Sequence, residues 1–189
     1  MIELEYEEKI LLRPEEFAMM KRLIGEPIQF YKQINYYYDT AELDMNRIGT
    51  TLRIREKDGI YTATIKEHNH NYNVEKSKRV KNEFDVSLFS VKGVRLLGSL
   101  LTERICMLKE DGLEIVLDKN IYLDTTDYEL EIEYSPKNEG KAKEVICNIG
   151  NLLDKEKTCN SDYCEFYNRT KLAKSKSQRF FERLKNIKQ

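Results

Sequence analysis

The sequence predicts an α+β protein whose centre is an eight-stranded antiparallel sheet, closed into a tunnel with a charged lumen and flanked by helices. Three observations favour this class. Charged and apolar residues alternate through residues 2–10, which gives a strand there one apolar and one charged face. The alternation returns in residues 52–56, 83–86 and 128–134. Segments with helical periodicity follow the strands after Pro136, and this order is typical of α+β proteins.

The strands follow from period-two patterns bounded by turn residues. We expect them at residues 2–12, 28–39, 49–57, 60–68, 77–86, 101–110, 113–122 and 127–135. Asp58-Gly59 and Asp111-Gly112 each predict a tight hairpin turn, so the strands that they join are antiparallel. Eight strands can close a barrel whose interior holds side chains or one small ligand.

Helices are predicted between and after the strands. Pro14, the acidic residues after it and Gly25 predict a short helix between the first two strands. A second short helix is expected at residues 90–100. A C-terminal helical segment, about 138–187, is expected to pack on the barrel, with helices at 138–153, 163–173 and 175–187. The chain is therefore expected to form a single domain over residues 1–189.

The repeated charged faces predict an enclosure instead of a solvated surface. Two carboxylates about 5 Å apart repel by roughly 3 kcal/mol at an effective dielectric constant near 20, so acids on adjacent strands need cations nearby. If the apolar faces point outward under the helices, the charged faces point inward. Such a lumen requires water, a metal ion and a polyanionic ligand, because unpaired buried charges are strongly destabilising.

Composition limits the partners. The chain has 189 residues, with 32 basic against 33 acidic side chains and a formal net charge of −1, so it has no overall attraction to nucleic acid or to an anionic membrane. No signal peptide, transmembrane run or lipidation motif is visible, and we expect a cytoplasmic protein. A homodimer is left open. The pair His68 and His70 lies in a polar run that predicts a surface loop. The four cysteines predict reduced thiols and no zinc site: Cys106, Cys147, Cys159 and Cys164.

Several motifs occur together in one order along the chain. They are Glu-x-Glu-x-Lys at 5–9, Leu-Arg-Ile-Arg at 52–55, Thr-Ile-Lys at 64–66, Asn-Glu-Phe-Asp at 82–85, Arg104, Asp118 and Glu-Ile-Glu at 131–133. In this combination the chain resembles the CYTH superfamily, also called triphosphate tunnel metalloenzymes, and in particular its small single-domain bacterial members. The resemblance extends from Glu3 to about Arg179. It implies the closed eight-stranded tunnel that the charged faces suggest.

The resemblance also implies roles for individual residues. Carboxylates would bind Mg²⁺ or Mn²⁺, which prefer hard oxygen ligands: Glu5, Glu7, Glu131 and Glu133. Basic residues would hold a triphosphate, for which arginine offers a bidentate fork: Lys9, Arg53, Arg55, Lys66 and Arg104. Catalytic positions would be Lys66, Glu83, Asp85 and Asp118, the three acids binding water or a second metal or orienting the bases. Lys174 and Arg179, with Lys176 between them, are either substrate-binding residues at the tunnel mouth or solvated helix charges.

The function expected from this resemblance is metal-dependent hydrolysis of a small triphosphate: tripolyphosphate, a nucleoside triphosphate or thiamine triphosphate. No Walker loop offers another phosphate chemistry. Two alternatives use the same site: an adenylate cyclase, and a non-catalytic module that binds nucleotide or polyphosphate. Thr102 stands where many members of the superfamily carry a basic residue, so the resemblance implies one phosphate contact fewer in this chain.

Overall fold

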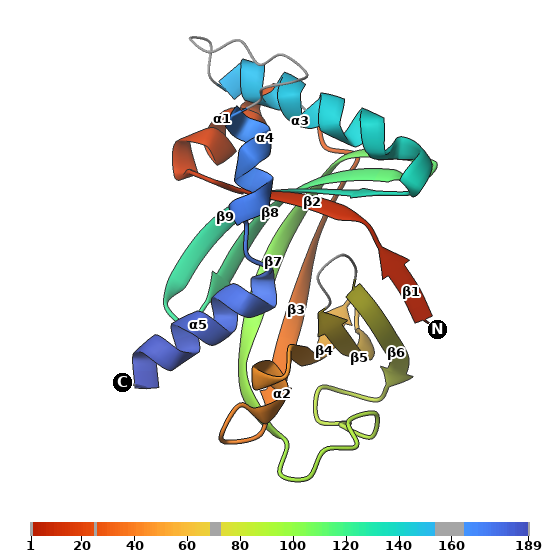
Figure 1. Cartoon of the computed structure of the whole chain (residues 1–189), viewed down its shortest axis with the longest axis vertical. Helices are drawn as coiled ribbons and strands as arrows, with labels where there is room; N and C mark the ends of the chain where they lie inside the picture. The colour runs from red at the N-terminus through yellow and green to blue at the C-terminus, as the bar shows by residue number, and fades with distance from the viewer. Residues whose placement is uncertain (1, 25, 69–72, 154–164, 189) are drawn as a thin grey trace.

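A computed structural model describes residues 2–24, 26–68, 73–153 and 165–188. For residues 2–5, 73, 165 and 188 only the backbone is described. Nine strands form one antiparallel sheet (Figure 1). They are β1 Ile2–Glu5, β2 Glu7–Leu12, β3 Gln29–Asp39, β4 Thr50–Lys57, β5 Ile60–His68, β6 Asn73–Val80, β7 Arg95–Glu110, β8 Leu113–Tyr122 and β9 Thr125–Tyr134. The helices are α1 Pro14–Ile24, α2 Asp44–Arg47, α3 Glu139–Leu153, α4 Glu165–Asn168 and α5 Lys176–Lys188, with 3-10 turns η1 Pro136–Asn138 and η2 Arg169–Leu172.

The N-terminal segment closes the sheet. The strand order is β1-β6-β5-β4-β3-β7-β8-β9-β2, and a single residue, Tyr6, separates the two strands at its ends. The first half of this segment pairs with β6 and the second half with β9. Tyr6 itself accepts a hydrogen bond from the backbone N–H of Tyr134. The strand predicted at 2–12 is therefore β1 and β2 in succession, and the predicted closed antiparallel tunnel is confirmed.

Local turn chemistry agrees with the sequence at both predicted hairpins. Asp58 and Gly59 both have positive φ, 54° and 74°, as the turn between two twisted antiparallel strands requires. Gly112 has φ 69° in the turn between β7 and β8. The predicted helix at residues 14–25 is α1, and the helix predicted at 138–153 is η1 followed by α3.

Two predicted elements are wrong. Residues 95–100, expected to be helical, are the beginning of β7, because this stretch pairs with residues 35–39 of β3. The strand expected at 77–86 begins at Asn73 and ends at Val80. The residues after it form a loop that is anchored to the outside of the sheet by Phe89, whose ring lies 5.6 Å from that of Tyr38. In both places tertiary contacts outweigh the local pattern.

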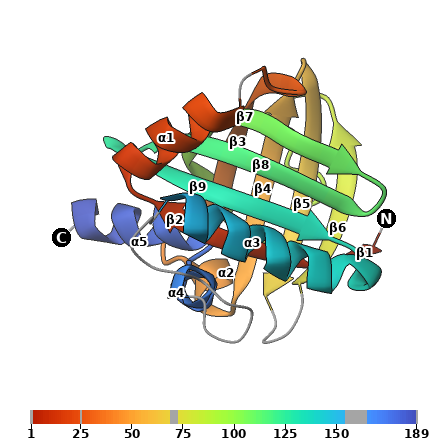
Figure 2. The same ribbon diagram turned by 90° about the horizontal axis from the view of Figure 1, so that it is seen from above.

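Apolar residues form clusters on the outside of the sheet and one at an end of the tunnel. Helices α1, α3 and α4 lie together over the outer face of β2, β8 and β9 (Figure 2), where Ile10, Leu130 and Ile146 are buried. A second cluster covers β3, β4 and β5. The third contains Phe180 and Phe181 of α5, which pack on Tyr37, Leu100 and Tyr122. The charged faces are left to point into the lumen, as the sequence predicts.

Two further expectations concern thiols and membranes. Cys106 and Cys147 are free thiols, while Cys159 and Cys164 lie outside the described residues. None of the helices in the described part of the chain is both long enough and apolar enough to cross a bilayer.

Candidate functional site

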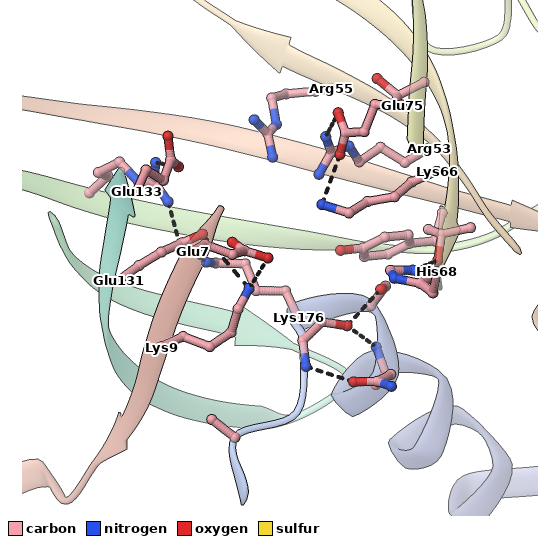
Figure 3. Close-up of a pocket in the computed structure, with 18 residues that line it drawn as sticks. Glu7, Lys9, Arg53, Arg55, Lys66, His68, Glu75, Glu131, Glu133 and Lys176 are labelled. Atoms are coloured by element: carbon pink, nitrogen blue, oxygen red, sulfur yellow. Dashed lines mark hydrogen bonds and ion pairs between the residues drawn. The ribbon is translucent and has the colours of Figure 1, made fainter. Parts of the chain in front are cut away.

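A cavity of about 380 Å³ lies inside the tunnel and has a dense charged lining (Figure 3). Six basic side chains contribute to it: Lys9, Arg53, Arg55, Lys66, Arg104 and Lys176. Within the described part of the chain, four carboxylates accompany them: Glu7, Glu75, Glu131 and Glu133. Most come from the alternate positions of β2, β4, β5 and β9, because residues two apart on a strand share a face. Basic and acidic side chains are distributed unevenly between two opposite walls of the cavity.

The acidic wall is formed by β2 and β9. Their register places Glu7 opposite Glu133 and Lys9 opposite Glu131. The Lys9 ammonium lies 2.7 Å from Glu7 and 3.9 Å from Glu131. Arg104, from β7, reaches the same wall and lies 2.7 Å from Glu131 and 3.7 Å from Glu133. Cations thus reduce the repulsion between the cross-strand acids, as the sequence requires.

Glu7 and Glu131 form a close pair with opposite pKa shifts. Burial opposes ionisation of Glu7, but Lys9, the Glu131 side chain and Lys66 together outweigh burial and hold the pKa of Glu7 well below its usual range. Burial raises the pKa of Glu131 to about 8, against the effect of Arg104 and Lys9. The Glu131 side chain is a hydrogen-bond partner of Glu7 and contributes to the lowering of its pKa. A hard divalent cation fits such a place, because it offers two negative charges on oxygen ligands, with Glu133 beside them.

The basic wall is formed by β4 and β5, with one acid from β6 (Figure 3). Glu75 lies 2.9 Å from Lys66 and 3.6 Å from Arg53. Arg53 and Lys66, two predicted substrate residues, thus share one carboxylate. Glu75 is not among the predicted site residues because it lies just before the strand expected at 77–86. The alternation of Glu75, Ser77 and Arg79 is the signal that places it on the same strand face.

Arg55 differs from the other cations of the cavity. Its guanidinium donates a 2.9 Å hydrogen bond from Nε to Oδ1 of Asn35, and among the described residues no carboxylate lies within ion-pair distance of it. Burial, reinforced by Arg53 and Arg104, lowers the pKa of Arg55 to about 10, so it remains protonated at neutral pH. A desolvated cation with no carboxylate at ion-pair distance in the described part of the chain, and with Glu75 acting on it only from farther away, is costly, and an anionic ligand would compensate it.

Beneath the acidic wall, a buried group of acids is already neutralised. Asp118, Glu129 and Glu131 bring carboxylate oxygens within 4.8 Å of one another, close enough to hold a metal ion. The Lys176 ammonium of α5 also lies among them, 3.0 Å from Asp118 and 2.6 Å from Glu131. Burial lowers the pKa of Lys176 to about 7. Asp118, expected to be catalytic, does not line the cavity but lies 2.7 Å from Arg104 and holds it in place.

Other predicted residues are not brought to the cavity. Glu83 and Asp85 lie in the loop after β6, where Asp85 accepts hydrogen bonds from the backbone N–H groups of Lys81 and Ser87. Their expected position on an inward strand face is wrong, because β6 ends before them. The side chain of Glu5 is outside the described residues, although its backbone pairs with Asn73 in β1.

The C-terminal basic residues separate into different positions. Arg179 is buried against Asp127 and Glu129, at 2.8 and 2.6 Å, and Lys174 pairs at the surface with Glu182. Neither lines the cavity, whereas Lys176 does.

The expectation that His68 is a surface loop residue is also wrong. This side chain lines the cavity with its Nε2 3.0 Å from the Thr51 hydroxyl. His70 lies outside the described residues.

Comparisons with known proteins agree with this geometry. The family model described as "CYTH domain" matches residues 3–158. The chain is 32% identical over 156 residues to "Putative triphosphatase YjbK" of Bacillus subtilis (strain 168). The aligned part covers 74% of this chain and 82% of that protein. A structure described as a "putative adenylate cyclase" from Bacillus halodurans has a TM-score of 0.70 at 22% identity, covering 95% and 98% of the two chains. HpAC1 from Hippeastrum, described as a "putative adenylyl cyclase" with a dominant triphosphatase activity, has a TM-score of 0.57 at 17% identity, covering 78% and 87%.

Proposed function

The chain belongs to the CYTH domain family, and from this membership we propose that it hydrolyses the terminal phosphoryl group of a small triphosphate inside the tunnel, with a divalent cation as cofactor. The observation that carries the proposal is the unequal charge of the two walls. Among the described residues, the basic wall has Arg53, Arg55 and Lys66 beside one carboxylate, Glu75. The opposite wall has three carboxylates, with Lys9 and Arg104 beside them. A triphosphate bound with a metal ion complements both walls, because its phosphate oxygens are negative and the metal ion is positive.

The basic residues bind and orient the phosphate chain. Arg53 and Arg55 lie two residues apart on β4 and their side chains point into the same cavity, so they can hold successive phosphoryl groups. Lys66, on the adjacent strand, adds a compact charge where negative charge spreads over the oxygens of the transferred group. Arg104 is held by Asp118, with two hydrogen bonds of 2.9 and 2.7 Å, so its position is fixed before the substrate arrives.

The acidic residues Glu7, Glu131 and Glu133 are the ligands that we assign to Mg²⁺ or Mn²⁺. When bound, the ion supplies Lewis-acid polarisation of the phosphoryl oxygens and lowers the pKa of bound water. The carboxylates themselves also repel the phosphate oxygens. This repulsion directs the triphosphate toward the basic wall and fixes its orientation across the cavity.

A phosphate-release panel tests the proposal. Tripolyphosphate, ATP, GTP and thiamine triphosphate are each incubated with Mg²⁺, with Mn²⁺ and with EDTA, and free phosphate is measured. We expect metal-dependent release from at least one triphosphate and none with EDTA. Formation of cyclic AMP and pyrophosphate from ATP would favour the cyclase instead. Binding without turnover of any of the four would favour the non-catalytic module.

A further inference from the structure

The partner of Arg55 sets this residue apart. Every other basic side chain of the cavity lining is within 4.0 Å of a carboxylate in the described part of the chain, whereas Arg55 contacts the neutral amide of Asn35. The two residues are direct cross-strand partners on β3 and β4, and the Asn35 side chain is completely buried.

Chemistry fixes the orientation of the Asn35 amide. A guanidinium can only donate, so the amide oxygen must face Arg55 and the NH₂ group must point away. That NH₂ group is buried and has no hydrogen-bond acceptor among the described residues. The one hydrogen-bond acceptor printed for Arg55 among the described residues is therefore neutral, and the negative charge of Glu75 acts on Arg55 from beyond ion-pair distance, which favours an anion at this place.

We propose that Asn35 is a positioning residue for anion binding: it holds the Arg55 guanidinium in the cavity wall through a neutral acceptor and so leaves its positive charge available to the ligand. This inference rests on the proposed triphosphate site and adds a residue to it. An aspartate has nearly the same size and would form an internal ion pair with Arg55. The neutral Asn35 side chain thus orients the Arg55 guanidinium without compensating its charge, whereas a carboxylate would do both.

The test compares Asn35→Asp with Asn35→Ala. Tripolyphosphate binding is measured by isothermal titration in the presence of EDTA, so that turnover and metal do not contribute, and thermal stability is measured without ligand. We expect Asn35→Asp to weaken binding on the order of tenfold to a hundredfold while the unliganded protein keeps or raises its Tm, because the new carboxylate neutralises Arg55. Asn35→Ala should weaken binding less, and it should lower the Tm.

Two controls show whether the effect passes through Arg55. In the Arg55→Ala background, Asn35→Asp should change binding less than about twofold, since the guanidinium on which it acts is absent. Gln33→Glu adds the same charge two residues away on β3 without facing Arg55 in the register, and it should weaken binding less than Asn35→Asp.

Three outcomes separate this inference from the function on which it rests. Equal losses from Asn35→Asp and Gln33→Glu, or additive losses in the double variant, would overturn the positioning role. Unchanged binding by Asn35→Asp would overturn it as well. If the wild-type protein binds no tripolyphosphate, the proposed function itself fails.

Discussion

At the scale of single residues, the cavity depends on which charges are already neutralised within the protein. Glu131 is compensated by Arg104 and Lys176, at 2.7 and 2.6 Å. Arg104 is fixed by Asp118. These groups are pre-oriented, which reduces the rearrangement needed when a charged ligand binds.

The metal assignment predicts the effect of Glu7→Gln. Removing this carboxylate takes away a ligand charge, so metal-dependent turnover should fall on the order of a hundredfold or more. The protein should remain folded, because Glu131 still compensates Lys9. Glu8→Gln is the matched control, since Glu8 is the next residue on β2 and is absent from the cavity lining. Turnover is measured against metal concentration, and equal rates for Glu7→Gln and the wild type at limiting Mg²⁺ would remove Glu7 from the metal site.

The basic wall predicts the effect of Arg55→Ala. Loss of a desolvated, charge-assisted contact should reduce turnover of a triphosphate by on the order of tenfold to a thousandfold. Lys76→Ala removes the same charge from an exposed side chain of β6, next to Glu75, and should have little effect. Steady-state kinetics of both variants at saturating metal is the measurement. Similar losses in the two would mean that net charge matters and the contact does not.

At the scale of elements, α5 closes an end of the tunnel with aromatic residues. The Phe180 ring lies 4.6 Å from that of Tyr37, a residue of the cavity lining, and the Phe180 side chain is completely buried. Gly98 of β7 allows this approach, since a Cβ atom there would be 3.0 Å from the Phe180 ring. The same helix carries Lys176 into the acid cluster. Stability and site geometry are therefore linked through one helix.

Phe180→Ala should destabilise the protein by about 3–5 kcal/mol, the usual cost of a large cavity in a packed core. Ile187→Ala, in the same helix but with a 49% exposed side chain, should change the free energy of unfolding by less than about 0.5 kcal/mol. Urea denaturation of both variants is the measurement. A small effect of Phe180→Ala would show that α5 contributes little to the fold.

A second link joins the beginning of the chain to its C-terminal part. Arg169 of η2 donates two hydrogen bonds, 2.9 and 3.0 Å, to the carboxylate of Glu16 in α1. Glu16 also accepts a 2.7 Å hydrogen bond from the backbone N–H of Arg13 and so caps its own helix. Burial opposes ionisation of this carboxyl, but Arg169 and Arg13 together lower the pKa of Glu16 to about 2.

This pKa predicts a pH dependence of stability. A carboxyl whose pKa is lower in the folded state stabilises the protein at pH values above its ordinary pKa near 4.5. This contribution disappears as the pH falls toward 2. Glu16→Gln should therefore lower the free energy of unfolding by about 1–3 kcal/mol at pH 7, and the difference from the wild type should shrink at pH 3. Glu15→Gln, at an exposed neighbouring position, is the control. A difference that stays constant from pH 7 to pH 3 would contradict the ion pair.

At the scale of the whole molecule, the closed sheet gathers charges that are far apart in the sequence. As far as the structure describes it, the cavity lining contains more basic than acidic side chains, although the chain as a whole carries a net charge of −1. This local excess is what an anionic ligand would neutralise.

Ligand binding should therefore stabilise the fold in proportion to the charges that it pairs. Tripolyphosphate at a hundredfold excess over its Kd adds about 2.7 kcal/mol to the free energy of unfolding, which a thermal-shift assay detects as a rise in Tm. Pyrophosphate at the same concentration should give a smaller rise, because it is too short to pair the same set of cations. Equal shifts from the two anions would indicate a general anion site.

The sequence by itself determined most of the strands, the hairpin turns and most of the charged residues that line the cavity. Glu7, Lys9, Arg53, Arg55 and the pair of acids on β9 follow from period-two alternation, a local property that does not require knowledge of the partner strand. The apolar stripe of α3 follows in the same way from helical periodicity.

Only the tertiary structure decided which charges meet. Glu75 reaches Arg53, Asn35 reaches Arg55, and Lys176 enters the acid cluster across wide separations in sequence. The loop after β6 keeps Glu83 and Asp85 away from the cavity. Pairing with β3 makes residues 95–100, predicted to be helical, the beginning of β7. The physical reason is that alternation fixes the face on which a side chain lies, whereas pairing and closure of the sheet fix the distances between faces. Electrostatic interactions depend on those distances.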